Sequence, residues 1–279
     1  LIDLGRVDLP LLGPTHLALP TYGVLIALAV LTGWFWFMRN ARREGLPLDR
    51  AASAALWSLL AAIVGGKLGL ALVEYDRYLL EPSNMLGTGF LQAAGLIWAA
   101  VLAGLATLIG LSWRWELPLG RLLDAAAIPV PLSQAIGRMG CLMAGCCFGD
   151  HCHAPWAIVY HSHEAHARTS VPLGTPLHPA PIYEALWCVL AVLPILLLAR
   201  RWRRRPGEVA LLYCVVYGTG RFFIEFARGD TARGLWFDGT LSTSQLISLA
   251  VVPIALAAFF LPSLAAGVIS AEARQLSSI

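Results

Sequence analysis

Seven long apolar stretches, separated by short polar segments, dominate the pattern of hydrophobic and polar positions along the chain. Each is long enough to cross about 30 Å of hydrocarbon as a helix that rises about 1.5 Å per residue. The pattern predicts seven transmembrane helices, at residues 18–38, 52–74, 89–112, 122–146, 181–199, 208–227 and 242–261. The expected fold class is an all-α integral membrane protein, a seven-helix bundle that forms one domain over residues 1–279.

The composition points in the same direction, since 58% of the 279 residues are hydrophobic and only 13% are charged. That balance excludes an ordinary soluble globular protein of this length. The segment before the first span has no basic start, no apolar run and no small-residue cleavage site. We therefore expect no signal peptide and a first span that is kept.

Arginine-rich loops follow the first, third and fifth predicted spans, at residues 39–45, 112–121 and 200–207. The other loops, above all 74–84 and 148–180, are poor in Arg and Lys. Because basic loops stay on the cytoplasmic side, we predict an N-terminus outside, a cytoplasmic C-terminus and an outward cap at 148–180. The net charge of +3 mostly expresses this asymmetry, so we expect no nucleic-acid partner.

Three cations lie inside predicted spans: Lys67, Arg138 and Arg221. An unpaired guanidinium is costly in hydrocarbon, so Arg138 should face a cavity and an anionic partner. Lys67 follows Gly65 and Gly66, a pair that indicates close helix contact. The alternative for Lys67 is a side chain that extends its amine to the membrane surface.

The sixth span carries a polar stripe. Tyr217, Arg221 and Glu225 recur every four residues, and Arg228 follows three residues later, so all four share one helical face. A structural ion pair between Arg221 and Glu225 explains part of the stripe, whereas a tyrosine with two cations is typical of an anion site. We predict that Arg138 and Arg221 converge on one anion, most simply a phospholipid phosphate.

Polar residues also mark the start of the fifth span, where His178, Tyr183 and Glu184 arrive with two prolines in LHPAPIYEAL. The prolines set the approach of the helix. Two interpretations remain open for the polar side chains. They belong to the site, or they cap the helix and anchor it at the membrane surface.

The segment GRMGCLMAGCCFGDHC, residues 137–152, holds four of the six cysteines. Three interpretations remain open. One is a disulfide, most easily from Cys152 to Cys146 or Cys147. A second is a reactive thiol, for which Cys141 is the candidate because it lies one helical turn from Arg138. The third is a metal site with nearby histidines: His151, His153, His161, His163 and His166.

Segments in a fixed order along nearly the whole chain carry a family likeness: PTYGVLIALAVLTG, VGGKLGLALVEY, AAGLIWAAVLAG, GRMGCLMAGCCFG, HPAPIYEA, YGTGRFFIEFAR and GTLSTSQLISL. Together they resemble the prolipoprotein diacylglyceryl transferase family. The resemblance implies a transferase of the bacterial inner membrane whose lipid cavity opens sideways. Such enzymes move the diacylglyceryl group of phosphatidylglycerol to the lipobox cysteine of an exported lipoprotein precursor and release glycerol phosphate.

The resemblance also implies site residues, and it implies neither a cofactor nor a metal. Arg138 and Arg221 match essential arginines of the family, and Tyr217 and Glu225 match its motif. With the cysteine argument, the expected catalytic residues are Arg138, Arg221, Tyr217 and Cys141. The expected substrate-binding residues are Tyr22, Lys67, Cys146, His178, Tyr183 and Glu225.

The chain departs from the family pattern at several polar positions. Where the signature has Asn, Asn and Glu, this chain has Cys141, Ala144 and Cys146, and Ala93 stands in place of a histidine. Two functions therefore remain open. One is a transferase that uses an anionic phospholipid and a thiol acceptor. The other is a membrane protein of the same fold that acts as a thiol, redox or lipid-binding factor through its cysteines.

Overall fold

The structure is a computed structural model, and it describes the backbone of residues 2–9, 13–19, 21–78, 80, 82–86, 90, 95–230 and 234–276. Side chains are described within residues 21–261 of these ranges, except at residues 77, 82 and 86. The chain forms two compact units, the first made of Leu1–Phe37 and Ala126–Ile279 and the second of Met38–Ala125. Each unit is described by itself, and the expectation of a single domain stays a prediction.

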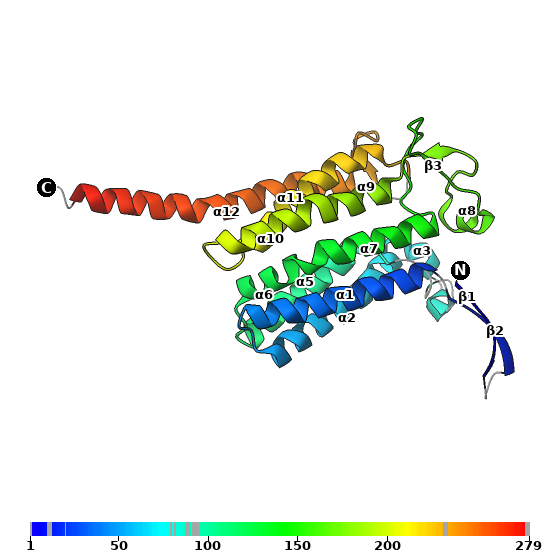
Figure 1. The fold of residues 1–279 in the computed structure, drawn as a ribbon, viewed down its shortest axis with the longest axis horizontal. Coiled ribbons are helices and arrows are strands. Elements are labelled where there is room, and N and C mark those ends of the chain that lie inside the picture. The colour runs from blue at the N-terminus through cyan, green and yellow to red at the C-terminus, as the bar shows by residue number, and fades with distance from the viewer. Residues whose placement is uncertain are drawn as a thin grey trace. The chain divides into compact units, whose positions relative to one another are not determined.

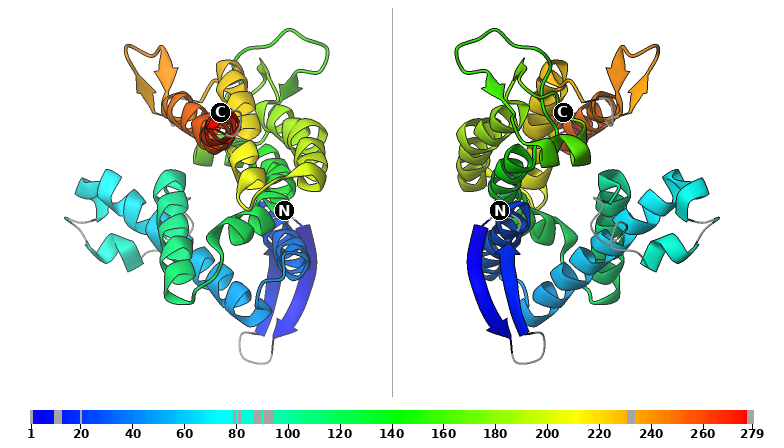
Figure 2. Two further views of the ribbon diagram at one scale, coloured as in Figure 1. Left: turned by 90° about the vertical axis from the view of Figure 1, so that its left-hand side faces the viewer. Right: turned by 90° about the vertical axis from the view of Figure 1, so that its right-hand side faces the viewer.

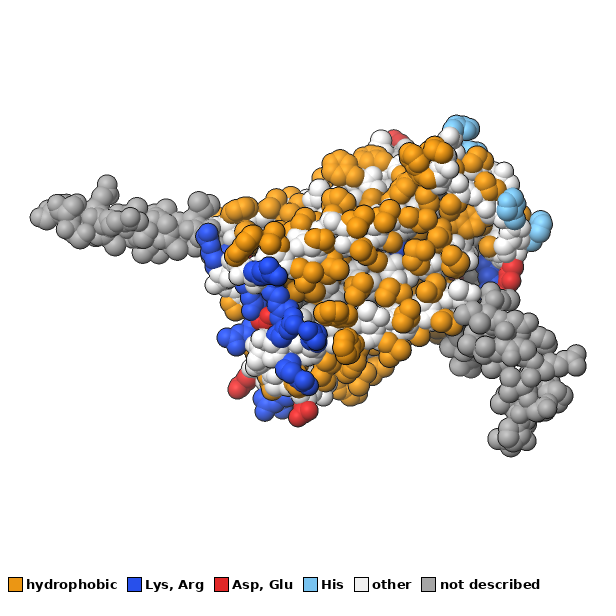
Figure 3. Space-filling view, viewed as in Figure 1, with side chains coloured by type: hydrophobic (Ala, Val, Ile, Leu, Met, Phe, Trp, Pro, Cys, Tyr) orange, Lys and Arg blue, Asp and Glu red, His pale blue; other side chains and the backbone are white. Residues whose placement is uncertain are grey.

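Among the described residues, six helices are long and apolar enough to cross a membrane, so the fold class of an all-α membrane protein is confirmed. They are α1 (Thr21–Arg43), α2 (Leu48–Val73), α5 (Ile97–Arg114), the stretch Ala180–Trp202, α11 (Glu208–Ile224, extended by the 3-10 turn η3, Glu225–Ala227) and α12 (Thr243–Leu276). Large hydrophobic side chains are exposed along their flanks, as lipid contact requires (Figure 3).

The predicted span at 122–146 is not one continuous helix, and the count of seven spans is not confirmed. The segment forms α6 (Leu119–Ala127) and α7 (Pro129–Ala144), which are separated at Ile128. Pro129 and Pro131 have no N–H groups, so the carbonyl groups of Ala125 and Ala127 lose their helical donors. The Asn40 amide replaces one of them, since its Nδ2 atom donates to Ala125 O at 3.3 Å.

The fifth span changes its helical geometry halfway. It begins as α9 (Ala180–Trp187), passes through the π-helical turn η2 (Cys188–Val192) and continues as α10 (Leu193–Trp202). In the turn, Leu193 N donates to Cys188 O, five residues back. Pro194 explains the wider turn, because its ring would crowd the carbonyl of Leu190 in a regular α-helix.

In the first unit, α7 packs beside α9, and α11 packs along α12 (Figure 1). A buried apolar cluster of this unit consists of Ala127, Ile128, Val192, Leu196 and Val209. In the same unit, histidine side chains gather near β3 and α8, and basic side chains gather at the other end, where α10 finishes (Figure 3).

In the part of the chain that the structure describes, three antiparallel hairpins accompany the helices (Figure 2). They pair β1 (Ile2–Leu9) with β2 (Gly13–Leu19), β3 (Ile158–Val159) with β4 (Pro176–Leu177), and β5 (Leu235–Trp236) with β6 (Leu241–Ser242). The segment expected to form a cap, 148–180, contains the second hairpin and the helix α8 (His163–Thr169), whose N-cap Ser162 accepts from Ala165 N.

In the second unit, α2 and α5 pack through small residues, as Gly65 and Gly66 predicted. A Cβ atom on Gly65 would overlap the side chain of Ala103. The backbone of Leu96 also donates to Gly66 O at 2.8 Å, so the two chains touch directly. The rest of the unit includes α3 (Tyr75–Tyr78) and the 3-10 turn η1 (Pro82–Leu86).

Replacing Gly220 by Ala should destabilise the first unit. A Cβ atom there would overlap the indole of Trp187, and overpacking of this kind costs typically about 1–3 kcal/mol. We expect a lower unfolding temperature in detergent, measured by intrinsic fluorescence. Gly110→Ala is the matched control, since nothing lies within 4 Å of its added methyl group. Equal unfolding temperatures for the two variants would contradict the packing argument.

Candidate functional site

One carboxylate on α9, Glu184, gathers the polar groups of three helices. Its Oε1 atom lies 2.9 Å from Arg138 Nη2 on α7 and accepts a hydrogen bond of 2.8 Å from the hydroxyl of Tyr217 on α11. Its Oε2 atom lies 3.9 Å from Arg221 Nη1, also on α11. The structure therefore brings Arg138 and Arg221 to one anion, and that anion is a side chain of the protein.

Arg221 is held by a second carboxylate and a hydroxyl group. Its Nη2 atom lies 2.5 Å from Glu225 Oε2 and donates to Ser244 Oγ at 3.2 Å. The pairing of Arg221 with Glu225 that the four-residue spacing predicted is confirmed. Among the described residues, Arg221 Nη1 is buried and has no hydrogen-bond partner. The 3.9 Å that separates this atom from Glu184 Oε2 is too long for a hydrogen bond, so the two groups interact only as charges.

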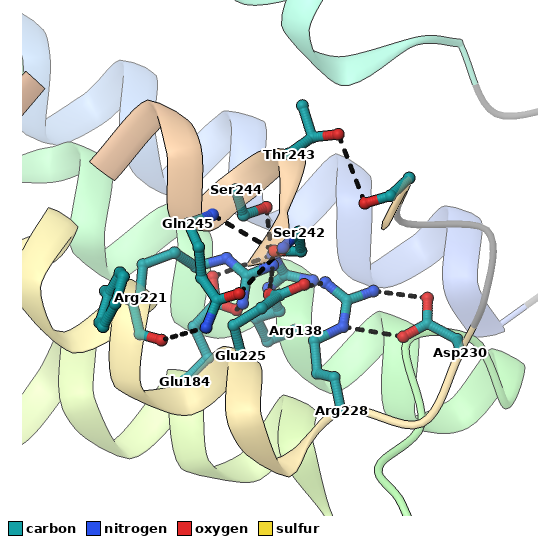
Figure 4. A network of polar contacts seen from close by, with 12 residues as sticks. Arg138, Glu184, Arg221, Glu225, Arg228, Asp230, Ser242, Thr243, Ser244 and Gln245 are labelled. Carbon is teal, nitrogen blue, oxygen red and sulfur yellow. Dashed lines mark hydrogen bonds and ion pairs between the residues drawn. The ribbon is translucent and has the colours of Figure 1, made fainter. Parts of the chain in front are cut away.

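Arg228 closes the network on the far side of Glu225 (Figure 4). Its Nε and Nη2 atoms donate to the two oxygens of Asp230 at 2.8 Å and 2.6 Å, and its Nη1 atom lies 3.8 Å from Glu225 Oε2. Three guanidiniums thus face three carboxylates, which leaves the network without a net formal charge. Only Arg138 is appreciably open, with 22% of its side chain exposed, against 7% for Arg221 and 9% for Arg228.

The start of α12 sets the position of Ser244, whose hydroxyl group contacts Arg221. Ser242 and Gln245 form a capping box: Gln245 N donates to Ser242 Oγ at 3.2 Å, and Ser242 N donates to Gln245 Oε1 at 2.9 Å. Gln245 Nε2 donates in addition to Phe222 O at 3.4 Å, which ties α12 to α11. Ser244, between the capping residues, is thereby directed at Arg221 (Figure 4).

Three thiols cluster at the end of α7. The Sγ atoms of Cys141, Cys146 and Cys147 all lie within 4.8 Å of one another, and all three residues are half-buried. Hydrogen bonds from Cys141 and Cys146 lower the pKa of the Cys147 thiol, and the nearby charges of Arg228 and Arg138 act in the same direction. Burial raises the pKa of Tyr160, whose hydroxyl donates to Leu142 O, to about 12.

The structure bears on two of the three interpretations of the cysteines, the disulfide and the metal site. All six are free, so the bridge expected from Cys152 to Cys146 or Cys147 is not formed. Cys152 is buried, and its sulfur accepts from Ala154 N instead. Among the described residues the only group with metal-ligand spacing is the trio of cysteines, and it includes none of the histidines. A reactive Cys141 stays a prediction.

His178 and Tyr183 form a separate group at the start of α9. His178 Nδ1 lies 3.0 Å from the Tyr183 hydroxyl, and Trp156 Nε1 donates to the same hydroxyl at 2.8 Å. Both residues therefore anchor the 148–180 segment to α9. Their expected part in substrate binding stays a prediction.

Two further candidate residues, Tyr22 and Lys67, contact parts of the chain outside the arginine and carboxylate network. The ring of Tyr22 on α1 packs on Gly140 of α7, where an added Cβ would lie 3.3 Å from it. Lys67 belongs to the second unit, where its ammonium donates to Phe90 O at 2.5 Å and lies 5.0 Å from the centre of the Phe90 ring. Their roles at the site stay predictions. Ala93, at the family's histidine position, lies outside the described residues.

The sequence alone does not settle the part that three residues play in the site. For Glu184 the sequence leaves two interpretations open, a residue of the site or a helix cap, although the adjacent Tyr-Glu pair in a span is a usable signal for the first. The sequence offers Cys147 only as a disulfide partner for Cys152, because residue spacing does not show the left-handed backbone that brings its sulfur to Cys141 and Cys146. Asp230, two residues after Arg228, was the third.

The fold and the site together define a multi-pass membrane protein with a buried arginine and carboxylate network at one end of its helices. Residues 11–261 match the model of the prolipoprotein diacylglyceryl transferase family. The chain belongs to that family.

Curated relatives cover most of the chain. It is 29% identical over 238 residues to phosphatidylglycerol–prolipoprotein diacylglyceryl transferase 2 of Clostridium perfringens, covering 83% of this chain and 86% of the relative. It is 31% identical to the phosphatidylglycerol–prolipoprotein diacylglyceryl transferase of Halalkalibacterium halodurans, covering 83% and 78%. The similarly named protein of Synechococcus elongatus is 30% identical, covering 86% and 82%.

Replacing Glu184 by Gln should strongly destabilise the protein. The variant keeps the shape of the side chain but leaves two guanidiniums short of a counter-charge, and such a loss costs about 3–5 kcal/mol in buried pairs. Unfolding in detergent would measure it.

The matched control is Glu164→Gln, which breaks an exposed pair with Arg168 and should cost less than about 1 kcal/mol. If both variants shift the unfolding transition equally, Glu184 is not the anchor of the network.

Proposed function

We propose that this protein transfers the diacylglyceryl group of phosphatidylglycerol to the thiol of a prolipoprotein. The names of its relatives support this reaction, and family membership supports the use of the same fold for it. The observation that carries the proposal is the pairing of Arg138 with Arg221 around Glu184, with one donor group of Arg221 left without a hydrogen bond.

A guanidinium suits the phosphate diester of the lipid because its planar fork binds two oxygens at once and keeps its charge. Arg138 is the more open of the two arginines, so it meets the headgroup first. Arg221, held by Glu225 and Ser244, offers from the buried side its Nη1 atom, which makes no hydrogen bond. Tyr217 and Glu184 keep Arg138 oriented.

The reaction forms a carbon–sulfur bond and breaks the bond between the glycerol carbon and the phosphate oxygen. Negative charge develops on the departing phosphate, and two fixed guanidiniums stabilise it more than they stabilise the diester. Glycerol phosphate leaves, and the thiol proton is taken up by the phosphate product or by solvent. The chain thus supplies binding, orientation and charge stabilisation from residues that are already in place.

An apolar groove beside the network is our candidate position for an acyl chain. It has a volume of about 190 Å³ and lies between α11 and α12, and its lining residues are Gly218, Thr219, Phe222, Phe223, Ser248, Leu249, Val252 and Pro253. Phe222 directly follows Arg221, so a lipid held here would keep its headgroup near the guanidiniums. This groove supports the expected sideways opening to lipid.

We also propose an orientation in the bacterial inner membrane. With the arginine-rich loops in the cytoplasm, the end that carries α8 and the network faces outward, where exported precursors arrive. Nothing in the described residues favours the alternative of a membrane factor without transferase chemistry.

Arg221→Lys and Arg138→Lys should each reduce transfer roughly 100-fold or more, because a point charge loses the bidentate geometry and one stabilising donor. The assay is transfer of labelled diacylglyceryl from phosphatidylglycerol to a lipobox peptide in detergent, together with rescue of a strain depleted of its own transferase.

Arg168→Lys is the control, since this arginine is 67% exposed and pairs only with Glu164 among the described residues. Full activity in both site variants would show that Arg138 and Arg221 do not contribute to transfer. Inactive but well-folded wild-type protein would contradict the proposed function itself.

A further inference from the structure

The cluster of three thiols at the end of α7 has no part in the transfer reaction as proposed above. The backbone around it brings the three sulfur atoms together in an unusual way. Cys141 belongs to the last turn of α7, and Cys146 and Cys147 follow the helix. A straight helix would carry residues five and six positions apart away from each other along its axis. In the structure all three sulfurs nevertheless lie within 4.8 Å of one another.

The chain reverses at a Schellman turn, which returns the second and third cysteines to the first. Gly145 has φ 73°, its N–H donates to Leu142 O, and Cys146 N donates to Cys141 O at 3.1 Å. Cys147 also adopts a left-handed backbone, with φ 57°, which is unusual for a residue with a side chain. Two successive backbone reversals thus gather the thiols.

The loop that carries the thiols is fastened on several sides. Thr169 Oγ1 donates to Gly145 O at 3.0 Å, Gly149 N donates to His178 O at 3.0 Å, and Asp150 N donates to Ala227 O at 2.9 Å. These bonds come from α8, from the start of α9 and from the end of η3. The three sulfurs are therefore held by a rigid frame before any ligand arrives, which lowers the entropy lost on binding.

We propose that Cys141, Cys146 and Cys147 form a three-thiolate binding site for a soft metal cation, with Cu(I) as the ion that fits best. Sulfur ligands select soft ions such as Cu(I) and Zn(II). Around an ion at about 2.3 Å, three sulfurs in a plane stand about 4.0 Å apart, a spacing within the 4.8 Å bound on the cluster.

The number of ligands favours Cu(I) over Zn(II). Structural zinc sites have four protein ligands, whereas the described residues supply three, with no fourth His, Cys, Asp or Glu in the group. Binding replaces three S–H bonds by three metal–sulfur bonds and releases three protons, and the ion enters and stays as Cu(I).

The test is a competition for Cu(I) between the full-length protein in detergent and a chromogenic Cu(I) chelator, under anaerobic and reducing conditions. We expect one Cu(I) per chain to be withdrawn from the chelator. Cys141→Ser, Cys146→Ser and Cys147→Ser should each weaken the affinity at least 10-fold, while Cys214→Ser, on α11, should leave it unchanged.

A second measurement uses only the wild-type chain, so it does not depend on whether a variant folds. Bound Cu(I) should protect the three clustered cysteines from maleimide, while Cys188 and Cys214 react as they do without metal. The proposal is overturned if the chelator retains the copper, if Cys214→Ser weakens binding as much as the cluster variants, or if protection does not map to the cluster. Preferential binding of Zn(II) in a direct competition would overturn the assignment to Cu(I).

Discussion

The sharing of one buried carboxylate by two arginines is the interaction on which the rest of the first unit depends. A guanidinium inside a membrane protein needs an opposite charge nearby, and Glu184 serves Arg138 and Arg221 from a third helix. The need for that meeting restricts how α7, α9 and α11 can pack. Close approach is possible because Gly220 leaves room for Trp187, whose indole then donates to Val216 O on α11.

Hydrophobic pattern was enough to predict the class of fold and most of the helices, because lipid requires long apolar runs whatever the details of packing. It was not enough for the segment from 122 to 146. There the prolines at 129 and 131 break the helix, and the side chain of Asn40, far away in sequence, takes over a carbonyl that they leave free. A hydropathy profile has no access to such a partner.

The candidate site was only partly predictable, and for different reasons at each residue. Arg221 and Glu225 are four residues apart on one helix, so local geometry alone predicts their pairing. Glu184 meets its partners across three helices, and a role as helix cap explained it equally well at the level of sequence. The thiol cluster depends on left-handed backbone at Gly145 and Cys147, which no spacing rule predicts for a cysteine.

The π-helical turn at Cys188–Val192 has a consequence for the surroundings of the fifth span. A turn with five-residue spacing shifts the angular position of everything after it, so the two halves of the span present different faces. The half with Glu184 faces the arginines, and the half with Leu196 faces the apolar cluster of Ile128 and Val209. The buried apolar contacts of α10 and the polar contacts of Glu184 therefore lie on different faces of the same span. One span thus serves two environments, with ion pairing at one end and apolar packing at the other.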